Sequence, residues 1–259
     1  MSKSKIDWCD ESLNFFTGCR NGCSFCYARK FANRLANMPG GHIYRRVKEH
    51  TGNSFEPAFH YDIYDRELEQ LKNSKKPKRI FVGSMGDMCF DEKAIIFNYY
   101  MPHSPDITYF TSPHVQTWCR HFADNTSHTI LLLTKRPDLI DKRILWPSNV
   151  HLGVSLTETD YKRPDRLKRY VHGSPLLWAS VEPLLDPDFN PECLEGLEWV
   201  VVGALTGKKK MISDSELRES VCRIIDYCSS EGIPVFVKEN IDRLFPDRTW
   251  PKQLPKETK

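Results

Sequence analysis

The sequence predicts an α/β protein on a parallel sheet, in which six or seven β/α units form a partial or nearly complete barrel. Short runs of β-branched and aromatic residues alternate with amphipathic stretches along the 259-residue chain, which is typical of strands alternating with helices. Several of these runs are apolar on both alternations, as strands covered on both faces are. A full eight-fold barrel takes about 250 residues, so the length favours a barrel over an open sheet.

Seven apolar runs are the expected strands: 13–17, 79–83, 129–134, 150–155, 176–181, 199–203 and 234–238. Six amphipathic stretches are the expected helices: 28–38, 64–73, 114–123, 137–145, 160–171 and 214–230. The last helix has the clearest pattern, because Leu217, Val221 and Ile224 fall on one face and Ser213 can cap its start. Right-handed crossovers between such units build a parallel sheet.

Two stretches, 39–60 and 97–113, have no clear periodicity and are expected to be loops or insertions. The second is rich in Tyr and Pro, and is either a packed surface loop or a lid over a substrate. Residues 1–247 are expected to form a single domain. Residues 248–259 are rich in Pro and Lys and are expected to be a flexible tail.

The composition indicates a soluble, cytoplasmic protein with no membrane partner. There is no run of about 18 apolar residues, and the first residues lack an apolar signal region. The 37 Lys and Arg against 34 Asp and Glu make the chain only mildly basic, with a net charge of +3. Nine cysteines, an odd number, without an export signal make a disulfide framework improbable.

Three of the cysteines, Cys19, Cys23 and Cys26, fall within eight residues between the first expected strand and the first expected helix. Thiolates in this CxxxCxxC spacing select zinc or an iron–sulfur cluster over hard cations. A structural zinc site needs a fourth protein ligand, which Cys9 or a histidine could supply in a non-catalytic binding protein. In a [4Fe–4S] cluster, three cysteines leave one iron open, as a catalytic cluster requires.

A CxxxCxxC motif with an aromatic residue before the third cysteine, here Phe25, resembles the radical S-adenosylmethionine (radical SAM) enzymes. The resemblance implies a β/α barrel whose Cys19, Cys23 and Cys26 bind three irons of a [4Fe–4S] cluster. It also implies that SAM chelates the fourth iron, with Phe25 against its adenine. A reducing partner such as flavodoxin or ferredoxin then drives cleavage of SAM to methionine and a 5′-deoxyadenosyl radical, which abstracts a hydrogen atom from the substrate.

More of the chain resembles a narrower group, the phage-associated Gp37/Gp68 family of uncharacterised proteins. The similar blocks lie at Trp8, 81–89, 128–137, 149–156, 178–185, 199–207 and 233–240. Two of these blocks depart from the family pattern. Ala204 and Leu205 stand in place of part of a Gly-Gly-Glu-Ser-like turn, and Glu239 and Asn240 in place of part of a Lys-Gln-Trp-Gly-like end. The departures suggest a different substrate if the family uses those positions on substrate.

Function in β/α barrels gathers at the carboxyl ends of the strands, so the polar residues there are candidates for binding SAM. The segment 83–87 stands where radical SAM enzymes often carry a Gly-Gly-Glu-like turn that binds the methionine amino group. By this resemblance Ser84 and Asp87 are candidates, since a hydroxyl or carboxylate accepts from an ammonium. The alternative is that Asp87 caps a following helix.

Five further residues lie at or after the ends of later strands. Lys135 and Arg136 could bind the SAM carboxylate or a substrate phosphate. Ser155 could hydrogen-bond to the ribose. Glu182, after an apolar strand, is either paired or functional. Lys238 closes the last expected strand, where the structural alternative is an ion pair with the adjacent Glu239.

The sequence does not identify the substrate. Basic clusters at 72–79, 162–169 and 208–210 are usually solvated faces, but they could contact a phosphate backbone. Together with the phage association, they make modification, isomerisation or repair of a nucleic-acid base or nucleotide one hypothesis. A small metabolite or a peptide is the alternative substrate. The sequence does not indicate a partner subunit.

Overall fold

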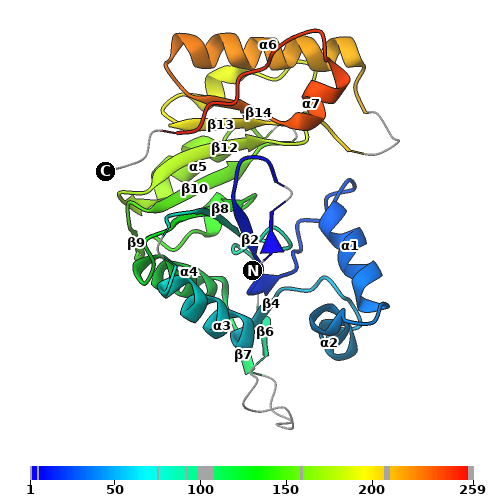
Figure 1. The fold of residues 1–259 in the computed structure, drawn as a ribbon, viewed down its shortest axis with the longest axis vertical. Coiled ribbons are helices and arrows are strands. Elements are labelled where there is room, and N and C mark those ends of the chain that lie inside the picture. The colour runs from blue at the N-terminus through cyan, green and yellow to red at the C-terminus, as the bar shows by residue number, and fades with distance from the viewer. Residues whose placement is uncertain are drawn as a thin grey trace.

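A curved sheet of eight strands forms the centre of the molecule (Figure 1). The computed structural model describes residues 2–4, 6–74, 76–91, 93–97, 108–157, 160–206 and 211–255. In sheet order the strands are β1 (Ser2–Lys3), β2 (Glu11–Leu13), β5 (Arg79–Val82), β8 (Thr129–Thr134), β10 (Val150–Ser155), β12 (Leu176–Val181), β13 (Trp199–Val202) and β14 (Val235–Val237). β1 is antiparallel to β2, and the other seven strands are all parallel. They curl into a half-barrel, which confirms the predicted fold class.

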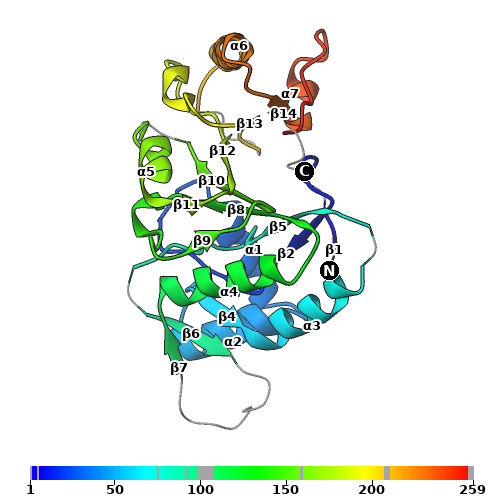
Figure 2. The same ribbon diagram turned by 90° about the vertical axis from the view of Figure 1, so that its left-hand side faces the viewer.

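Helices cover the outer face of this sheet (Figure 2). They are α3 (Tyr61–Lys72), α4 (Ser112–Asp124), α5 (Arg163–Tyr170), α6 (Asp214–Ser230) and α7 (Glu239–Leu244), with 3₁₀ turns η1 (Pro137–Leu139) and η2 (Pro191–Leu194). Alternate strand residues point to opposite faces. Thus Val150, Leu152 and Val154 of β10 join the core under the helices, while Gly153 packs against Trp178 inside the half-barrel.

Aromatic side chains fill the amino-terminal half of the inner face, which we call the floor. The floor consists of Trp8, Cys9, Phe81, Leu131, Leu176, Trp178, Trp199, Val201 and Phe236. The Trp8 ring lies 4.9 Å from that of Phe81 and 5.3 Å from that of Trp178, between centroids. A Cβ at Gly153 would come within 2.5 Å of the Trp178 ring, so only glycine leaves room for it.

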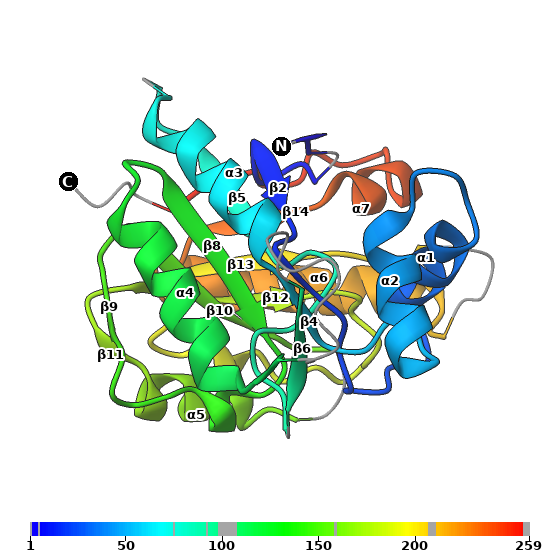
Figure 3. The same ribbon diagram turned by 90° about the horizontal axis from the view of Figure 1, so that it is seen from below.

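A second, four-stranded sheet lies beside the first and was not expected from the sequence. Its order is β3 (Phe16–Thr17), β4 (Ala58–His60), β6 (Ala94–Phe97) and β7 (Thr108–Phe110). The helices α1 (Tyr27–Ala36) and α2 (His42–Thr51) stand side by side at one side of the molecule (Figures 1 and 3). Residues 39–60 are therefore not a loop, because they form α2 and β4. Within 97–113, β7 and the start of α4 are ordered elements, and residues 98–107 lie outside the described residues.

Two other elements differ from their predictions. The expected strand 13–17 is interrupted, because the chain leaves β2 at Leu13 and pairs in the second sheet from Phe16. The expected helix 137–145 is only the turn η1, followed by β9 (Leu145–Trp146), which pairs with β11 (His172–Gly173). Gln116 explains why residues 137–145 do not form a helix. Its amide donates to the Leu139 carbonyl and accepts from the Asp141 N–H, both at 2.9 Å, which holds the chain in a turn.

The segment 248–255 packs against β14, so the prediction of a flexible tail is wrong for these residues. Backbone hydrogen bonds of 2.9 Å join Val237 to Pro251 and Gln253 to Val235. The Trp199 indole donates to the Gln253 carbonyl at 3.0 Å. Residues 256–259 lie outside the described part of the chain. In the described part, no helix has both the length and the apolar character needed to cross a membrane.

Candidate functional site

The three cysteines lie on one loop that leaves the second sheet after Thr17 and ends at α1. Gly18 starts this loop with a φ of +83°, and a Cβ there would lie 2.0 Å from the Glu56 carbonyl oxygen. Gly18 also bridges to Gly86, which lies beyond the carboxyl end of β5. The cysteine loop, residues 18–26, is thus held at the carboxyl-terminal edge of the half-barrel.

All three thiols are free and partly exposed. The Cys19 sulfur accepts the Asn21 N–H at 3.3 Å, and the Cys26 sulfur accepts the Arg29 N–H at 3.3 Å as the N-cap of α1. Burial raises the pKa of Cys19 to about 12, with further contributions from Asp87 and the other two cysteines. The three thiols therefore share one electrostatic environment, in which a soft metal centre would have to displace a proton from Cys19.

The donor set fits an iron–sulfur cluster, because three thiolates on one loop are the ligands that such clusters take. Among the described residues, no three His, Cys, Asp or Glu side chains converge on the position of a single metal ion. Cys9 lies in the floor beside Trp8 and its thiol contacts Ser4, near the start of β2. It is therefore at the opposite end of the half-barrel from the cysteine loop, and the sequence-based suggestion of Cys9 as a fourth ligand is wrong.

Asp87 joins the cysteine loop to two strand ends. Its Oδ2 accepts from the Asn21 side chain at 2.9 Å and from the Lys135 N–H at 3.0 Å, and its Oδ1 accepts from the Cys89 N–H at 3.0 Å. Burial raises the pKa of Asp87, while these hydrogen bonds oppose that shift. The prediction that Asp87 could cap a helix is wrong, because β6 is the next described element.

Ser84 lies in a hydrogen-bonded group above the ends of β2 and β5. Its hydroxyl accepts from the Asn14 amide at 3.1 Å, and the Asn14 carbonyl oxygen accepts from the Met85 N–H at 2.9 Å. The Tyr27 hydroxyl donates to the Ser84 carbonyl at 2.7 Å. The first residue of α1 therefore reaches across the opening to the β5 loop.

Lys135 and Phe25, both predicted site residues, are brought together. The Lys135 ammonium lies 5.4 Å from the centroid of the Phe25 ring and donates to the Thr157 hydroxyl at 2.8 Å. A pocket of about 500 Å³ opens beside them. Its lining residues are Arg20, Asn21, Gly22, Cys23, Ser24, Lys135, Arg136, Thr157 and Arg163. Four of these nine carry a positive charge, but three of the four are paired with carboxylates outside the lining: Arg20 with Glu56, Arg136 with Asp91 and Arg163 with Asp160.

Ser155 and Glu182 follow the next strands along. Ser155 is 7% exposed, and its carbonyl accepts from Arg163 at 2.7 Å. Glu182 forms a hydrogen-bonded ion pair with Lys238, both partly buried. A Cβ at Gly203 would lie 3.0 Å from the Lys238 side chain and 3.1 Å from that of Glu182. The predicted Lys238–Glu239 pair is wrong, because the Lys238 ammonium turns inward to Glu182.

Asn14 and Tyr27 are site residues that the sequence analysis did not single out, and Asn240 stood there only as a departure from the family pattern. Asn240 accepts from the Ala204 N–H at 3.2 Å and donates to the Ala204 carbonyl at 2.7 Å, which fixes the turn after β13. Asn14 could have been predicted from the alternation of side chains along a strand. Leu13 points to the helix-covered face of the sheet, so the next residue, Asn14, is expected to point inward. Tyr27 and Asn240 carried no such signal, because their roles depend on tertiary contacts.

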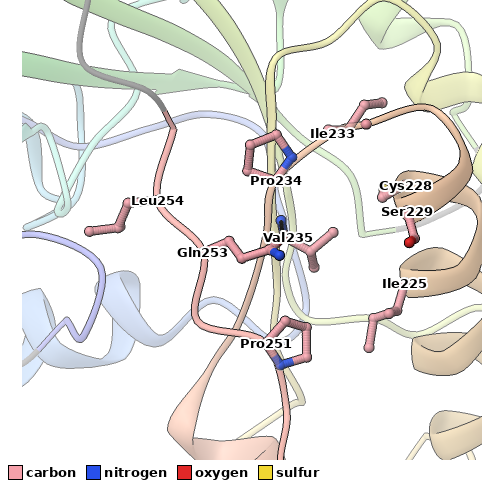
Figure 4. A pocket seen from close by; sticks show the side chains of 10 residues that line it. Ile225, Cys228, Ser229, Ile233, Pro234, Val235, Pro251, Gln253 and Leu254 are labelled. Atoms are coloured by element: carbon pink, nitrogen blue, oxygen red, sulfur yellow. Dashed lines mark hydrogen bonds between the residues drawn. The ribbon is translucent and has the colours of Figure 1, made fainter.

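A second pocket, of about 370 Å³, lies between α6, the start of β14 and the segment 251–254 (Figure 4). Ile225, Ile233 and Val235 give it a largely apolar lining. It lies at the amino end of β14, whereas Lys238 and the cysteine loop lie at the carboxyl ends of the strands. It is therefore not part of the site described above.

The fold and the site define a class: α/β half-barrel proteins with a three-cysteine loop at the carboxyl edge of the sheet. Within that class, the chain belongs to the phage Gp37/Gp68 family, since residues 3–242 match the family model described as "Protein of unknown function (DUF5131)". No curated protein and no solved structure matched the chain.

Proposed function

We propose that the protein is a radical SAM enzyme that carries a [4Fe–4S] cluster on Cys19, Cys23 and Cys26. When bound, the cluster and SAM would together supply a 5′-deoxyadenosyl radical for hydrogen abstraction. The observation that carries the proposal is the position of the CxxxCxxC loop. It lies at the carboxyl edge of a parallel half-barrel, where β/α barrels place their chemistry, with Phe25 and Lys135 packed beside it.

Different residues of the chain would hold the cysteine loop and bind the separate groups of SAM. Asp87 and Asn21 hold the cysteine loop in place. Lys135 offers a positive charge beside Phe25, suited to the carboxylate of SAM. The Ser84 hydroxyl and the Glu182 carboxylate are acceptors on other strands of the same opening, suited to an ammonium or a ribose hydroxyl, and Ser155 lies at the end of the strand between those of Lys135 and Glu182.

The geometry also bears on the substrate. Of the basic clusters, 72–79 lies at the amino ends of the strands, with Lys78 paired to Glu11 and Arg79 to Asp10, away from the site. In the cluster 162–169, Arg163 lines the pocket beside Cys23. Residues 208–210 lie outside the described part of the chain. The hypothesis of a nucleotide or nucleic-acid base rests on Lys135 and on the arginines of this pocket, for which a substrate phosphate would compete with their carboxylate partners.

Anaerobic reconstitution tests the enzyme class. The wild type, Cys23→Ala and a control, Cys193→Ala, are loaded with iron and sulfide, and then incubated with SAM and dithionite. We expect about four irons per chain and slow formation of 5′-deoxyadenosine in the wild type and in the control, and loss of both in Cys23→Ala. Cys193 is a matched control, because it is a free and partly exposed cysteine far along the chain.

The competing function is a metal-stabilised binding protein without catalysis. Stoichiometric zinc in the purified protein, lost in Cys23→Ala, together with no 5′-deoxyadenosine from iron-loaded wild type, would establish that function and remove the radical SAM proposal.

A further inference from the structure

Tyr27 places an aromatic ring in the opening of the half-barrel. It is the first residue of α1, directly after Cys26, and it is 59% exposed. Its hydroxyl donates to the carbonyl of Ser84, beyond the carboxyl end of β5, at 2.7 Å. Because this hydrogen bond fixes the position of the ring, a planar ligand can stack on it at little cost in side-chain entropy.

The Tyr27 ring lies in a concave part of the molecule. Its side chain is largely exposed, yet burial raises the pKa of its hydroxyl, and the charge of Glu182 contributes to the same shift. A side chain that is open to water and still surrounded by protein lines a depression in the surface. Glu182 follows β12 as Ser84 follows β5, so both lie at the carboxyl edge of the sheet and border the same opening.

The ion pair of Glu182 and Lys238 has hydrogen-bonding capacity to spare. The Lys238 ammonium donates to one oxygen of the Glu182 carboxylate, and both side chains are partly buried. Within the described part of the chain, the other carboxylate oxygen accepts no hydrogen bond and the ammonium donates no second one. An acceptor and a donor therefore remain side by side for a ligand.

The chemistry of the ion pair indicates which kind of group it would bind. The pair has no net charge, so it suits a neutral group with a hydrogen-bond donor and an acceptor on adjacent atoms. Every nucleobase has such an edge, and its flat ring stacks on aromatic side chains. A peptide backbone does not fit, because the N–H and C=O of a trans peptide point in opposite directions. Tyr27 and the ion pair together therefore favour a nucleobase over a peptide.

We propose that a nucleobase of the substrate stacks on Tyr27, and that Glu182 and Lys238 bind the hydrogen-bonding edge of that base. This inference rests on the proposed function and narrows its substrate to a ligand that carries a base. It gives Glu182 to the substrate and leaves Lys135 and the Ser84 hydroxyl to SAM. Because Tyr27 directly follows Cys26, a base on its ring lies beside the cysteine loop. A free nucleotide and a single strand share this chemistry, whereas a base in a duplex would have to leave its stack.

The first test measures base binding apart from phosphate binding. A labelled short single strand containing all four bases is compared with an abasic strand of the same length, which carries the same phosphates. The full-length protein is used metal-free and after reconstitution with iron and sulfide. We expect the wild type to bind the base-bearing strand at least about 10-fold more tightly than the abasic strand. No binding, or equal affinity for the two strands, in both forms of the protein would overturn the inference.

Variants of Tyr27 test the stacking. Tyr27→Leu should bind the base-bearing strand at least about 10-fold more weakly and the abasic strand as the wild type does. Tyr27→Phe keeps the ring and loses only the hydrogen bond to Ser84, so it should retain most of the preference for bases. The control, Tyr109→Leu, removes another exposed tyrosine, on β7, and should behave as the wild type. A preference that survives in Tyr27→Leu, or that Tyr27→Phe loses to the same extent, would overturn the stacking role.

Glu182→Gln tests the role of the ion pair. The Lys238 ammonium is then no longer neutralised and should attract the phosphates that both strands carry. We therefore expect tighter binding of the abasic strand and a smaller preference for the base-bearing one. The control, Glu69→Gln, removes a carboxylate from an exposed ion pair with Lys72 and should leave the preference unchanged. An unchanged preference in Glu182→Gln would show that the ion pair does not bind the base.

Competition and catalysis complete the test. Displacement of the labelled strand by nucleoside monophosphates would identify a free nucleotide as the ligand, and a failure to displace it would identify a base within a strand. The binding experiments need no catalysis, so they decide this inference by themselves. Absence of 5′-deoxyadenosine from the reconstituted wild type with dithionite would count against the proposed function alone.

Discussion

The floor of the half-barrel and its rim, by which we mean Lys135, Glu182 and Lys238 at the carboxyl ends of the strands, are built by the same sheet but differ in chemistry. Toward the amino ends, the inward positions are aromatic, as at Phe81 and Trp178. Toward the carboxyl ends, the inward positions are polar, as at Lys135, Glu182 and Lys238. The change occurs over four residues, since Trp178 lies in β12 and Glu182 directly follows the last residue of that strand. The sheet therefore changes from an apolar core to a polar edge along its own strands.

The largest effect is expected from breaking the floor. Trp178→Ala removes a fully buried indole that contacts Trp8 and Trp199, and should lower the free energy of unfolding by about 3–5 kcal/mol. Urea unfolding of the metal-free protein measures it. Cys23→Ala, on the partly exposed loop, should stay within about 0.5 kcal/mol of the wild type. Equal losses in the two variants would contradict the comparison.

Two glycines, Gly153 in the floor and Gly203 at the rim, allow the packing of the two regions to be compared. In Gly153→Ala the new Cβ would come within 2.5 Å of the packed Trp178 ring, and we expect a loss of about 1–3 kcal/mol. In Gly203→Ala the new Cβ would meet only the Lys238 and Glu182 side chains, at 3.0 Å and 3.1 Å, which can shift. The rim variant should therefore lose less stability than the floor variant in the same urea measurement. The reverse order would show that the rim is the more tightly packed region.

Acid should weaken the fold through buried histidines. Burial lowers the pKa of His151, on β10, to about 4 and that of His60, on β4, to about 3. As pH falls below about 6.5, the unfolded chain takes up protons that the folded chain does not, so stability is lost. Between pH 7 and pH 5 each histidine should contribute about 2 kcal/mol of this loss. His151→Gln should lose correspondingly less stability over that range, and an unchanged pH dependence would contradict a buried neutral His151.

Breaking the rim ion pair should have a smaller effect on stability than breaking the floor. Lys238→Met leaves the partly buried Glu182 carboxylate without its cation and should lower the free energy of unfolding by about 1–2 kcal/mol. The double variant with Glu182→Gln should recover part of this loss, since no charge is then left unpaired. A double-mutant cycle measures the coupling. Strictly additive losses would mean that the two side chains do not interact in solution.

The central sheet could be predicted from the sequence because its strands carry a strong, continuous apolar signal. β8, β10 and β12 have the boundaries expected from their β-branched and aromatic runs. The second sheet could not be predicted, because β3 and β4 are only two and three residues long. Runs this short have no periodicity to read. The helix α2 was also not predicted, because the Pro-Gly-Gly sequence at 39–41 just before it is typical of a loop.

The cysteine triplet, Phe25 and Lys135 could be proposed from motif and position, because strand ends of a parallel sheet meet at one edge. The partners of Glu182 and Asp87 could not. Glu182 pairs with a lysine 56 positions later in the chain, and Asp87 binds Asn21, 66 positions earlier. Both partnerships depend on which strands lie side by side in the sheet, and a single sequence does not specify which distant residues meet there.

The hydrogen bonds of Asp87 have a mechanical meaning. One buried carboxylate is bonded both to Asn21, between two of the cysteines, and to the backbone of Lys135, across the pocket. The cysteine loop and Lys135, one of the positively charged residues of the pocket, are therefore held by the same side chain. Because both bonds end on the same carboxylate oxygen, we expect a ligand that displaces the cysteine loop to displace the Lys135 backbone as well.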